Sequence, residues 1–239
     1  MKNITAIFSK ELKGYFNSPI AYIFLTVFLS LSSWIFFKTF FINNEVVMTD
    51  FFDIIPWLYL FFIPALSMRL WSEEKKQGTL ELLFTSPVND IEAVIAKFLG
   101  SFAFLLLSIG LTFSIPLTLV RIGHPDIGQI FTGYVGTLLL GGSYLAIGMW
   151  ISSLTENQIV AFILSVVISF LFFLSGESFF LLSLPEYLRP FFEVLGLGTH
   201  FNSISRGVID SRDIIYYLSF ISFFLYLNIK SLETRYYRG

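Results

Sequence analysis

The sequence predicts an all-α integral membrane protein, and three observations lead to this fold class. Of its 239 residues, 55% are apolar and 13% are charged, whereas a soluble domain usually has about 25% charged residues. One soluble core could not bury all 30 Phe side chains. Long apolar runs also recur along the chain, each near the roughly 20 residues that a helix needs to cross a bilayer.

Six of these runs are predicted to cross the membrane as helices, because backbone polar groups cannot remain unpaired in lipid. The whole chain, 1–239, is interpreted as one transmembrane domain. The predicted membrane helices span residues 20–42, 51–71, 91–121, 127–152, 157–176 and 214–230. The last of them has the shortest uncharged run, and Tyr and Lys side chains flank it, as is typical of the membrane interface.

The distribution of Lys and Arg predicts how the chain is oriented. Six crossings put both termini on one side, and ten of the 15 Lys and Arg residues fall on that side. The other five are Lys38, Arg121, Arg189, Arg206 and Arg212. The positive-inside rule therefore places both termini in the cytoplasm. The formal net charge is only −2, so no nucleic-acid partner is expected.

Two further parts of the chain are predicted to be helical without crossing the membrane. In residues 1–19, apolar positions recur near helical spacing among polar ones, which indicates an amphipathic helix on the cytoplasmic membrane surface. The alternative there is a frayed tail. In the outer loop, 177–213, the apolar stretches 179–184 and 191–197 are too short to span the bilayer. They are interpreted as half-inserted or surface helices on the outer face.

Several kinds of chemistry are excluded by residue types. The chain has no Cys and only two His residues, so disulfides, cysteine-ligated metal and a histidine-rich metal site are not expected. No Gly-Lys dipeptide occurs, and a Walker motif requires one. We therefore expect no catalytic residues, no metal and no cofactor bound by this chain. An intramembrane enzyme and a stand-alone secondary transporter are weaker alternatives, because the predicted helix interiors are almost free of charge.

The loop 72–90, between the second and third predicted crossings, has an unusual pattern. Charged residues come first, Gly78 breaks the pattern, and a short apolar piece, 79–85, follows before Pro87. This pattern predicts a short helix across the ends of two membrane helices. Its apolar side chains would be poorly placed in water, so either a partner protein or the membrane surface must cover them.

The stretch from Glu74 to Val88, which reads EKKQGTLELLFTSPV, resembles the cytoplasmic loop of ABC-2-type transporter permeases. In that family an acidic and a basic residue precede Gly-Thr-x-Glu, a Leu pair and Thr-x-Pro, with a Lys further on, here Lys97. The resemblance implies that this loop is a coupling helix docked on a nucleotide-binding subunit. The residues it assigns to coupling are Glu73, Glu74, Lys75, Lys76, Gly78, Thr79, Glu81, Leu82, Leu83, Phe84, Thr85 and Pro87.

Two other segments take a possible role from the same resemblance. In the short loop 152–157, Ser153 and Glu156 have capping-box spacing, and the family suggests a second ATPase contact there; the alternative is a plain helix-starting turn. Residues 200–213 look like the segment before the last crossing in the gliding-motility-associated permease of Bacteroidetes, and the nitrous-oxide-reductase maturation permeases are similar there. Family members line or gate the outer end of the pathway with this region, which makes His200 and Arg206 gate candidates. The alternative for His200 is a structural role.

The resemblance implies the permease subunit of an ATP-driven transporter in the bacterial inner membrane, serving export or gliding motility. ATP and Mg would then be bound by a partner, a dimer of cytoplasmic ABC ATPase subunits. A second permease-like subunit, or a second copy of this chain, would complete the pathway, and membrane lipid would surround it.

Overall fold

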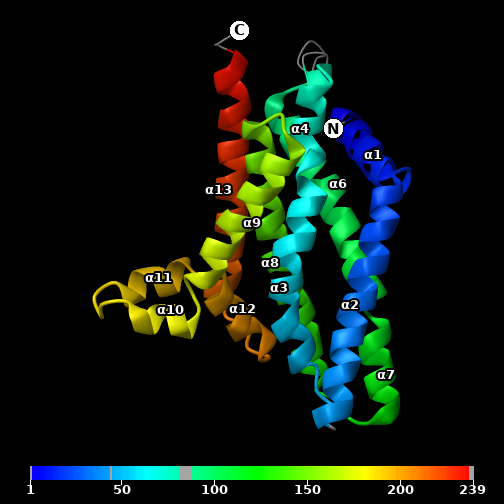
Figure 1. Ribbon diagram of the computed structural model, residues 1–239, viewed down its shortest axis with the longest axis vertical. Coiled ribbons are helices and arrows are strands. Elements are labelled where there is room, and N and C mark those ends of the chain that lie inside the picture. Colours follow the sequence, from blue (N-terminus) through cyan, green and yellow to red (C-terminus); the bar gives the residue numbers. More distant parts are fainter. Residues whose placement is uncertain (1, 44, 81–87, 237–239) are drawn as a thin grey trace.

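The computed structural model describes residues 2–43, 45–80 and 88–236, and all regular secondary structure in these ranges is helical. Figure 1 shows a bundle of long helices that run roughly along one axis. The helices are α1 (Lys2–Phe16), α2 (Pro19–Asn43), α3 (Thr49–Ser67), α4 (Arg69–Lys76), α6 (Asp90–Leu111), α7 (Ser114–Ile122), α8 (Ile127–Leu154), α9 (Gln158–Leu174), α10 (Ser178–Ser183), α11 (Arg189–Leu195), α12 (Leu197–Ser205) and α13 (Ser211–Tyr236).

Five helical segments in the described residues are long and apolar enough to cross a membrane. They are Ala21–Asn43, Thr49–Lys76, Asp90–Ile122, Ile127–Leu154 and Ser211–Thr234. The apolar helix α9 has 17 residues and measures about 26 Å at roughly 1.5 Å per residue, slightly less than the ~30 Å hydrocarbon core. The predicted all-α membrane fold is therefore confirmed, and the count of six crossings stays a prediction.

Several helix ends differ from the expected ones. Residues 72–76, expected in a loop, form the end of α4, which follows α3 after a single residue. The expected short crossing at 214–230 belongs to α13, a helix of 26 residues. The helix α12 was not expected at all, because its mixture of polar and apolar residues shows no long apolar run.

The expected helix 91–121 is divided into α6 and α7 at Thr112 and Phe113. Pro116 has no N–H, so the carbonyl of Thr112 cannot receive the usual helical bond four residues later. The N–H of Ile115 donates to that carbonyl instead, at 2.9 Å. The hydroxyl of Thr112 also donates to the carbonyl of Ile109 at 2.6 Å. Two features therefore explain the break between α6 and α7. Pro116 lacks a hydrogen-bond donor, and the hydroxyl of Thr112 bonds to a main-chain carbonyl of the helix.

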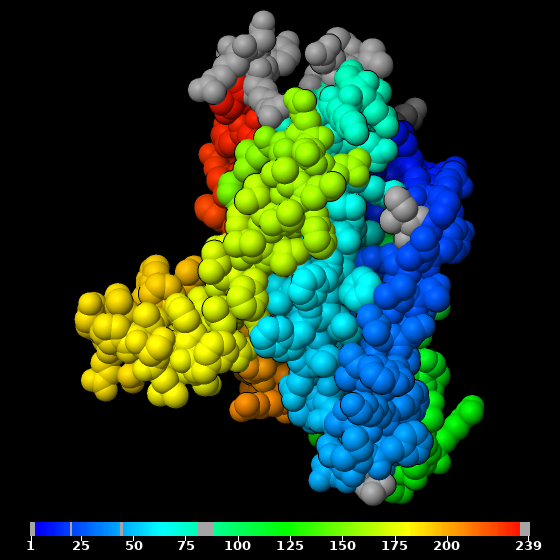
Figure 2. All heavy atoms as spheres, viewed as in Figure 1, coloured from blue at the N-terminus to red at the C-terminus, as the bar shows by residue number. Residues whose placement is uncertain are grey.

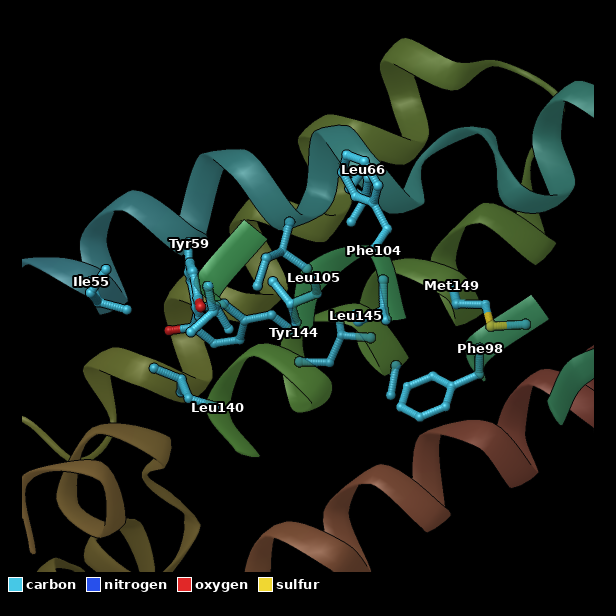
Figure 3. Close-up of a cluster of buried hydrophobic side chains, with 14 of the residues drawn as sticks. Ile55, Tyr59, Leu66, Phe98, Phe104, Leu105, Leu140, Tyr144, Leu145 and Met149 are labelled. Carbon is cyan, nitrogen blue, oxygen red and sulfur yellow. The ribbon is translucent and has the colours of Figure 1, made fainter. Parts of the chain in front are cut away.

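The helix α8 is central to the bundle and packs against α3, α6, α9, α12 and α13. Its glycines allow α3 to approach closely. A Cβ atom on Gly133 would lie 2.2 Å from the Phe52 ring, and one on Gly148 would lie 1.9 Å from the Ser67 hydroxyl. Figure 3 shows side chains of α3, α6 and α8 meeting in the core that results, including Tyr59 and Tyr144, which are fully buried.

The helices α10 and α11 form a hairpin that projects sideways from the bundle (Figures 1 and 2). This agrees with the expected short helices at 179–184 and 191–197. Large apolar side chains on the hairpin are exposed, among them Phe179, Leu182, Tyr187 and Phe191. Behind the hairpin, α12 packs against α8, α9 and α13, so it connects the hairpin to the bundle.

Candidate functional site

The predicted coupling residues that the structure describes, which are Glu73, Glu74, Lys75, Lys76, Gly78 and Thr79, lie at the end of the bundle that carries α1, α4 and the last described residues of α13 (Figure 1). We call this end the platform; it comprises α1, α4, residues 90–100 of α6, and the turn 155–157 between α8 and α9. Charged side chains from three of these helices meet there, and the interactions among them determine how the helices are joined.

Lys97 of α6 lies at the centre of the platform, with a side chain only 2% exposed. Its ammonium donates to Glu11 Oε1 of α1 at 2.7 Å and to the carbonyl of Leu70 at 3.0 Å. It also forms an ion pair with Glu74 Oε1 of α4 at 2.9 Å. Three acceptor oxygens on α1 and α4 therefore surround the ammonium. Lys97 therefore links α1, α4 and α6, and it lies 4.8 Å from the centre of the Trp71 ring.

The helix α1 is seated directly against α6. A Cβ atom on Gly100 would lie 2.9 Å from the Cβ of Glu11, so the glycine allows the two helices to touch. The Tyr15 hydroxyl shares a hydrogen bond with Ser101 Oγ at 2.9 Å and donates to the carbonyl of Leu66 at 3.3 Å. Burial raises the pKa of Tyr15 to about 12, although the Ser101 bond lowers it. The predicted helix at 1–19 is therefore packed and not a frayed tail.

The start of α4 is held by Ser152 of α8. The Ser152 hydroxyl accepts hydrogen bonds from the N–H groups of Trp71 and Ser72, each at 3.1 Å, and donates to the carbonyl of Met68 at 2.7 Å. The first N–H groups of a helix have no partner within the helix itself. A side chain of α8 therefore satisfies two groups at the α3–α4 junction and fixes where α4 begins.

The end of α4 is held by α8 as well. The ammonium of Lys75 donates to the main-chain carbonyl of Ser153, in the last turn of α8. The carbonyls in that turn have no partner within the helix, and the helix dipole favours a positive charge beside them. The structure thus brings a residue of the predicted coupling loop into contact with a residue of the predicted second contact.

Two grooves open on the platform. One, of about 540 Å³, lies between the end of α4 and the start of α9 and is lined by Lys76, Glu156, Asn157, Gln158 and Ile159. The other, of about 700 Å³, runs between α1 and α4 and includes Lys10, Glu73, Gln77, Thr79 and Lys97 in its lining. Both grooves are lined largely by polar side chains, which suits contact with a protein partner better than contact with lipid tails.

The capping box predicted for Ser153 and Glu156 is wrong. The helix α8 continues to Leu154, so Ser153 is still helical, and its hydroxyl donates to the carbonyl of Trp150 at 2.6 Å. The residue that caps α9 is Asn157, whose Oδ1 accepts from the N–H groups of Ile159 at 2.9 Å and of Val160 at 3.5 Å. Asn is among the residues most favoured at this position.

Other predicted residues also have defined places. Gly78 ends α4 with a φ of +67°, in the left-handed region that favours glycine. The Thr79 hydroxyl donates to the carbonyl of Glu74 at 3.3 Å, and Glu73 Oε1 accepts from the side-chain amide of Gln77 at 3.2 Å. The predictions that fall on Glu81, Leu82, Leu83, Phe84, Thr85 and Pro87 lie outside the described residues.

The sequence did not reveal the role of three residues that join the helices at the platform. Lys97 entered only as an element of the family pattern, while Glu11 and Ser152 were given no role. One signal was available for Lys97, because a charged residue within a predicted membrane helix is costly and needs a partner. Nothing in the sequence identifies Glu11 as that partner, since 86 residues separate the two.

The gate candidates His200 and Arg206 lie on α12 and at its end, away from the platform. His200 Nδ1 is 2.6 Å from Asp213 Oδ1, and its Nε2 is 3.2 Å from the carbonyl of Val194. These contacts favour the structural alternative for His200. Arg206 is exposed.

Comparison with known proteins adds an independent finding. Residues 35–227 match the family described as ABC-2 family transporter protein, and this range includes α4, α6, α8 and nearly all of the other helices after α2. Among curated proteins, no relative matches the chain. Members of this family form the transmembrane component of ABC transporters and generally work with an ATPase subunit. The chain therefore belongs to the ABC-2 transporter family and is a multi-pass membrane subunit of an ABC-type transporter.

Proposed function

We propose that this chain is the permease subunit through which a separate cytoplasmic ATPase drives movement across the bacterial inner membrane. The observation that carries the proposal is the bond from Lys75 to the carbonyl of Ser153. This bond joins the two segments that the resemblance assigns to ATPase contact, so one ATPase subunit could contact both segments. With the platform facing the cytoplasm, both termini lie there too.

In this proposal the loop 72–90 docks on the ATPase. Gly78 ends α4, and the residues after it form the docking element. The charged side chains Glu73, Glu74, Lys75 and Lys76 orient the docking, and Leu82, Leu83 and Phe84 supply apolar area that the partner covers. Thr79, Glu81, Thr85 and Pro87 belong to the same contact by resemblance, and Ser153 and Glu156 belong to the second contact beside the groove at Lys76.

The proposed mechanism starts on the partner, because ATP and Mg are bound there and not by this chain. ATP draws two ATPase subunits together, and the loop 72–90 moves with them. Motion of α4 reaches α6 and α1 through Lys97, and it reaches α8 through Ser152 and Lys75. The helices then rock as rigid bodies between two arrangements, which the ATPase contacts differently.

A second permease-like subunit, or a second copy of this chain, completes the pathway within the lipid. His200 and Arg206 are proposed near its outer end. The similarity of residues 200–213 to gliding-motility-associated permeases supports a role in export or in a gliding-associated complex, with the 239 residues acting as one transmembrane domain.

Affinity purification tests this function. The tagged chain is isolated in mild detergent, co-purifying proteins are identified by mass spectrometry, and ATPase activity is measured in the eluate. We expect a Walker-motif ATPase and a second permease, with both activity and co-purification lost in Leu83→Asp. Ile127→Asp is the matched control, because Ile127 is 70% exposed at the start of α8, at the far end from the platform.

Two outcomes would overturn the proposal. The first is a chain that elutes alone, without ATPase activity, even after chemical cross-linking. The second is transport of a solute along an ion gradient by the purified single chain without ATP, which would favour a stand-alone secondary transporter.

A further inference from the structure

Away from the platform, His200 connects three helices. It lies on α12, and both of its ring nitrogens have close partners on neighbouring elements. Nδ1 is 2.6 Å from Asp213 Oδ1 on α13, and Nε2 is 3.2 Å from the carbonyl of Val194 on α11. The ring of Tyr216 stacks on the imidazole with a centroid distance of 3.9 Å. His200 therefore joins the α10–α11 hairpin to the bundle.

Both partners of His200 are hydrogen-bond acceptors. An ionised carboxylate and a main-chain carbonyl can only accept hydrogen bonds. A neutral imidazole has one N–H group and can donate to only one of them, whereas the imidazolium donates to both. We infer that His200 is a protonated clamp between Asp213 and Val194, and that loss of its proton loosens the α10–α11 hairpin where α11 meets α12 and α13.

The buried state of Asp213 strengthens the clamp. Asp213 is 7% exposed, and its Oδ2 atom is buried with no hydrogen-bond partner among the described residues. The charge on His200 compensates this carboxylate. When the imidazole becomes neutral, a buried carboxylate is left without a cation in contact, which is costly. Opening of the hairpin would let water reach Asp213, so deprotonation favours opening.

The other charged groups on the surrounding elements do not replace this cation. They are Glu177 between α9 and α10, Arg189 and Glu193 on α11, Arg206 after α12, Asp210 before α13, Arg212 at its start, and Asp53 on α3, which packs against α12. Within the described residues, His200 is the only cationic group that forms an ion pair with Asp213. Arg212 donates its main-chain N–H to Asp210 Oδ1, at 2.9 Å.

Two tyrosines hold the same junction without titrating in the usual range. The Tyr216 hydroxyl donates to the carbonyl of Leu195 at 2.6 Å, and the Tyr217 hydroxyl donates to the carbonyl of Leu197 at 2.8 Å. Phenols ordinarily keep their proton until about pH 10, whereas histidine changes charge between about pH 5 and 8. Tyr217 therefore keeps α12 in place, and Tyr216 still ties the last residue of α11 to α13, when His200 loses its proton. The hairpin should loosen without detaching or unfolding.

Spin-label distances test the clamp, and the absence of native Cys makes labelling simple. One label replaces Tyr187, 79% exposed between α10 and α11, and the other replaces Ser222, exposed on α13. The distance distribution is measured by pulsed electron paramagnetic resonance, with the chain and its co-purifying subunits in lipid nanodiscs. We expect a narrow distribution near pH 5 and a broader one, with longer distances, near pH 9.

Matched variants distinguish a pH response that depends on His200 from a general loosening of the junction between the hairpin and the bundle. His200→Gln should remove the pH response, and His124→Gln, which changes the other histidine, should keep it. Tyr216→Phe removes the bond to Leu195 and should broaden the distribution at both pH values while the response remains. If His200→Gln does not fold, Asp213→Asn replaces it, because a neutral partner no longer favours the charged ring. A distribution that is the same at both pH values, or a response that persists in His200→Gln, would overturn the inference.

Discussion

Lys75 donates a hydrogen bond to the main-chain carbonyl of Ser153, 78 residues away in the sequence. The bond joins the end of α4 to the end of α8, immediately beside the turn that leads into α9. In the proposed mechanism, a movement of α4 would therefore displace the last turn of α8 as well. Three predictions concern α4, α6 and their contacts at the platform, and a fourth concerns Glu177, between α9 and α10.

Replacing Lys75 by Met should weaken the link between α4 and α8. A hydrogen bond from a charged group contributes roughly 1.5–3 kcal/mol, and partial exposure places Lys75 at the lower end of that range. For a chain of this size, each kcal/mol lowers Tm by about 2–4 °C, which thermal unfolding in detergent would detect. ATP-dependent transport should fall by a larger proportion. Lys13→Met, on the exposed face of α1, is the control; an equal effect of both variants would contradict the prediction.

Replacing Lys97 by Met should destabilise the platform strongly, because Glu11 and Glu74 lose the cation between them. Breaking a buried pair by removing one partner typically costs about 3–5 kcal/mol. A triple variant that also carries Glu11→Gln and Glu74→Gln should be more stable than Lys97→Met alone, since no unpaired carboxylate remains. Thermal unfolding of the unchanged chain, Lys97→Met and the triple variant tests this order. A Lys97→Met protein as stable as the unchanged chain would refute it.

Two glycines of α6 should respond oppositely to the same substitution. Gly100→Ala places a Cβ atom 2.9 Å from the Glu11 Cβ, so α1 must move away from α6; overpacking of this kind costs about 1–3 kcal/mol. No atom lies within 4 Å of a Cβ on Gly110, and Gly110→Ala should gain up to about 1 kcal/mol of helix propensity. Limited proteolysis of α1 and thermal unfolding distinguish them. Faster cleavage in Gly110→Ala than in Gly100→Ala would contradict the interpretation.

Glu177 should make the stability depend on pH. Burial raises the pKa of this carboxyl above its ordinary 4.5, and the nearby Asp53 raises it further. A folded-state pKa above the unfolded value means that protonation favours the folded chain, so this contribution is present at low pH and is lost as the pH rises through the raised value. Glu177→Gln should remove that loss and increase Tm at neutral pH. A decrease of Tm in Glu177→Gln at neutral pH would contradict the sign.

The sequence determined the fold class and the approximate positions of the helices. Long apolar runs can only be helices in lipid, so the spanning segments were found within a few residues. The break at Thr112 was missed although Pro116 is visible in the sequence, because a proline can be absorbed within a helix as well as break it. Pro56 and Pro64 lie inside the continuous helix α3. The capping of α9 by Asn157 was missed because α8 ends later than expected.

For the candidate site, the sequence named Lys75 and Ser153 separately, and only the tertiary structure decided that they meet. The same holds for Lys97 and Glu11, and for His200 and Asp213. Apolar periodicity and turn residues act over a few neighbouring positions, so they determine secondary structure and membrane insertion. A buried charge, in contrast, is satisfied by whichever opposite group helix packing places within about 3 Å, and the packing depends on close fits such as Gly100 against Glu11. The partner of each buried charge is therefore decided by the three-dimensional arrangement of helices, because electrostatic pairing acts through space and not along the chain.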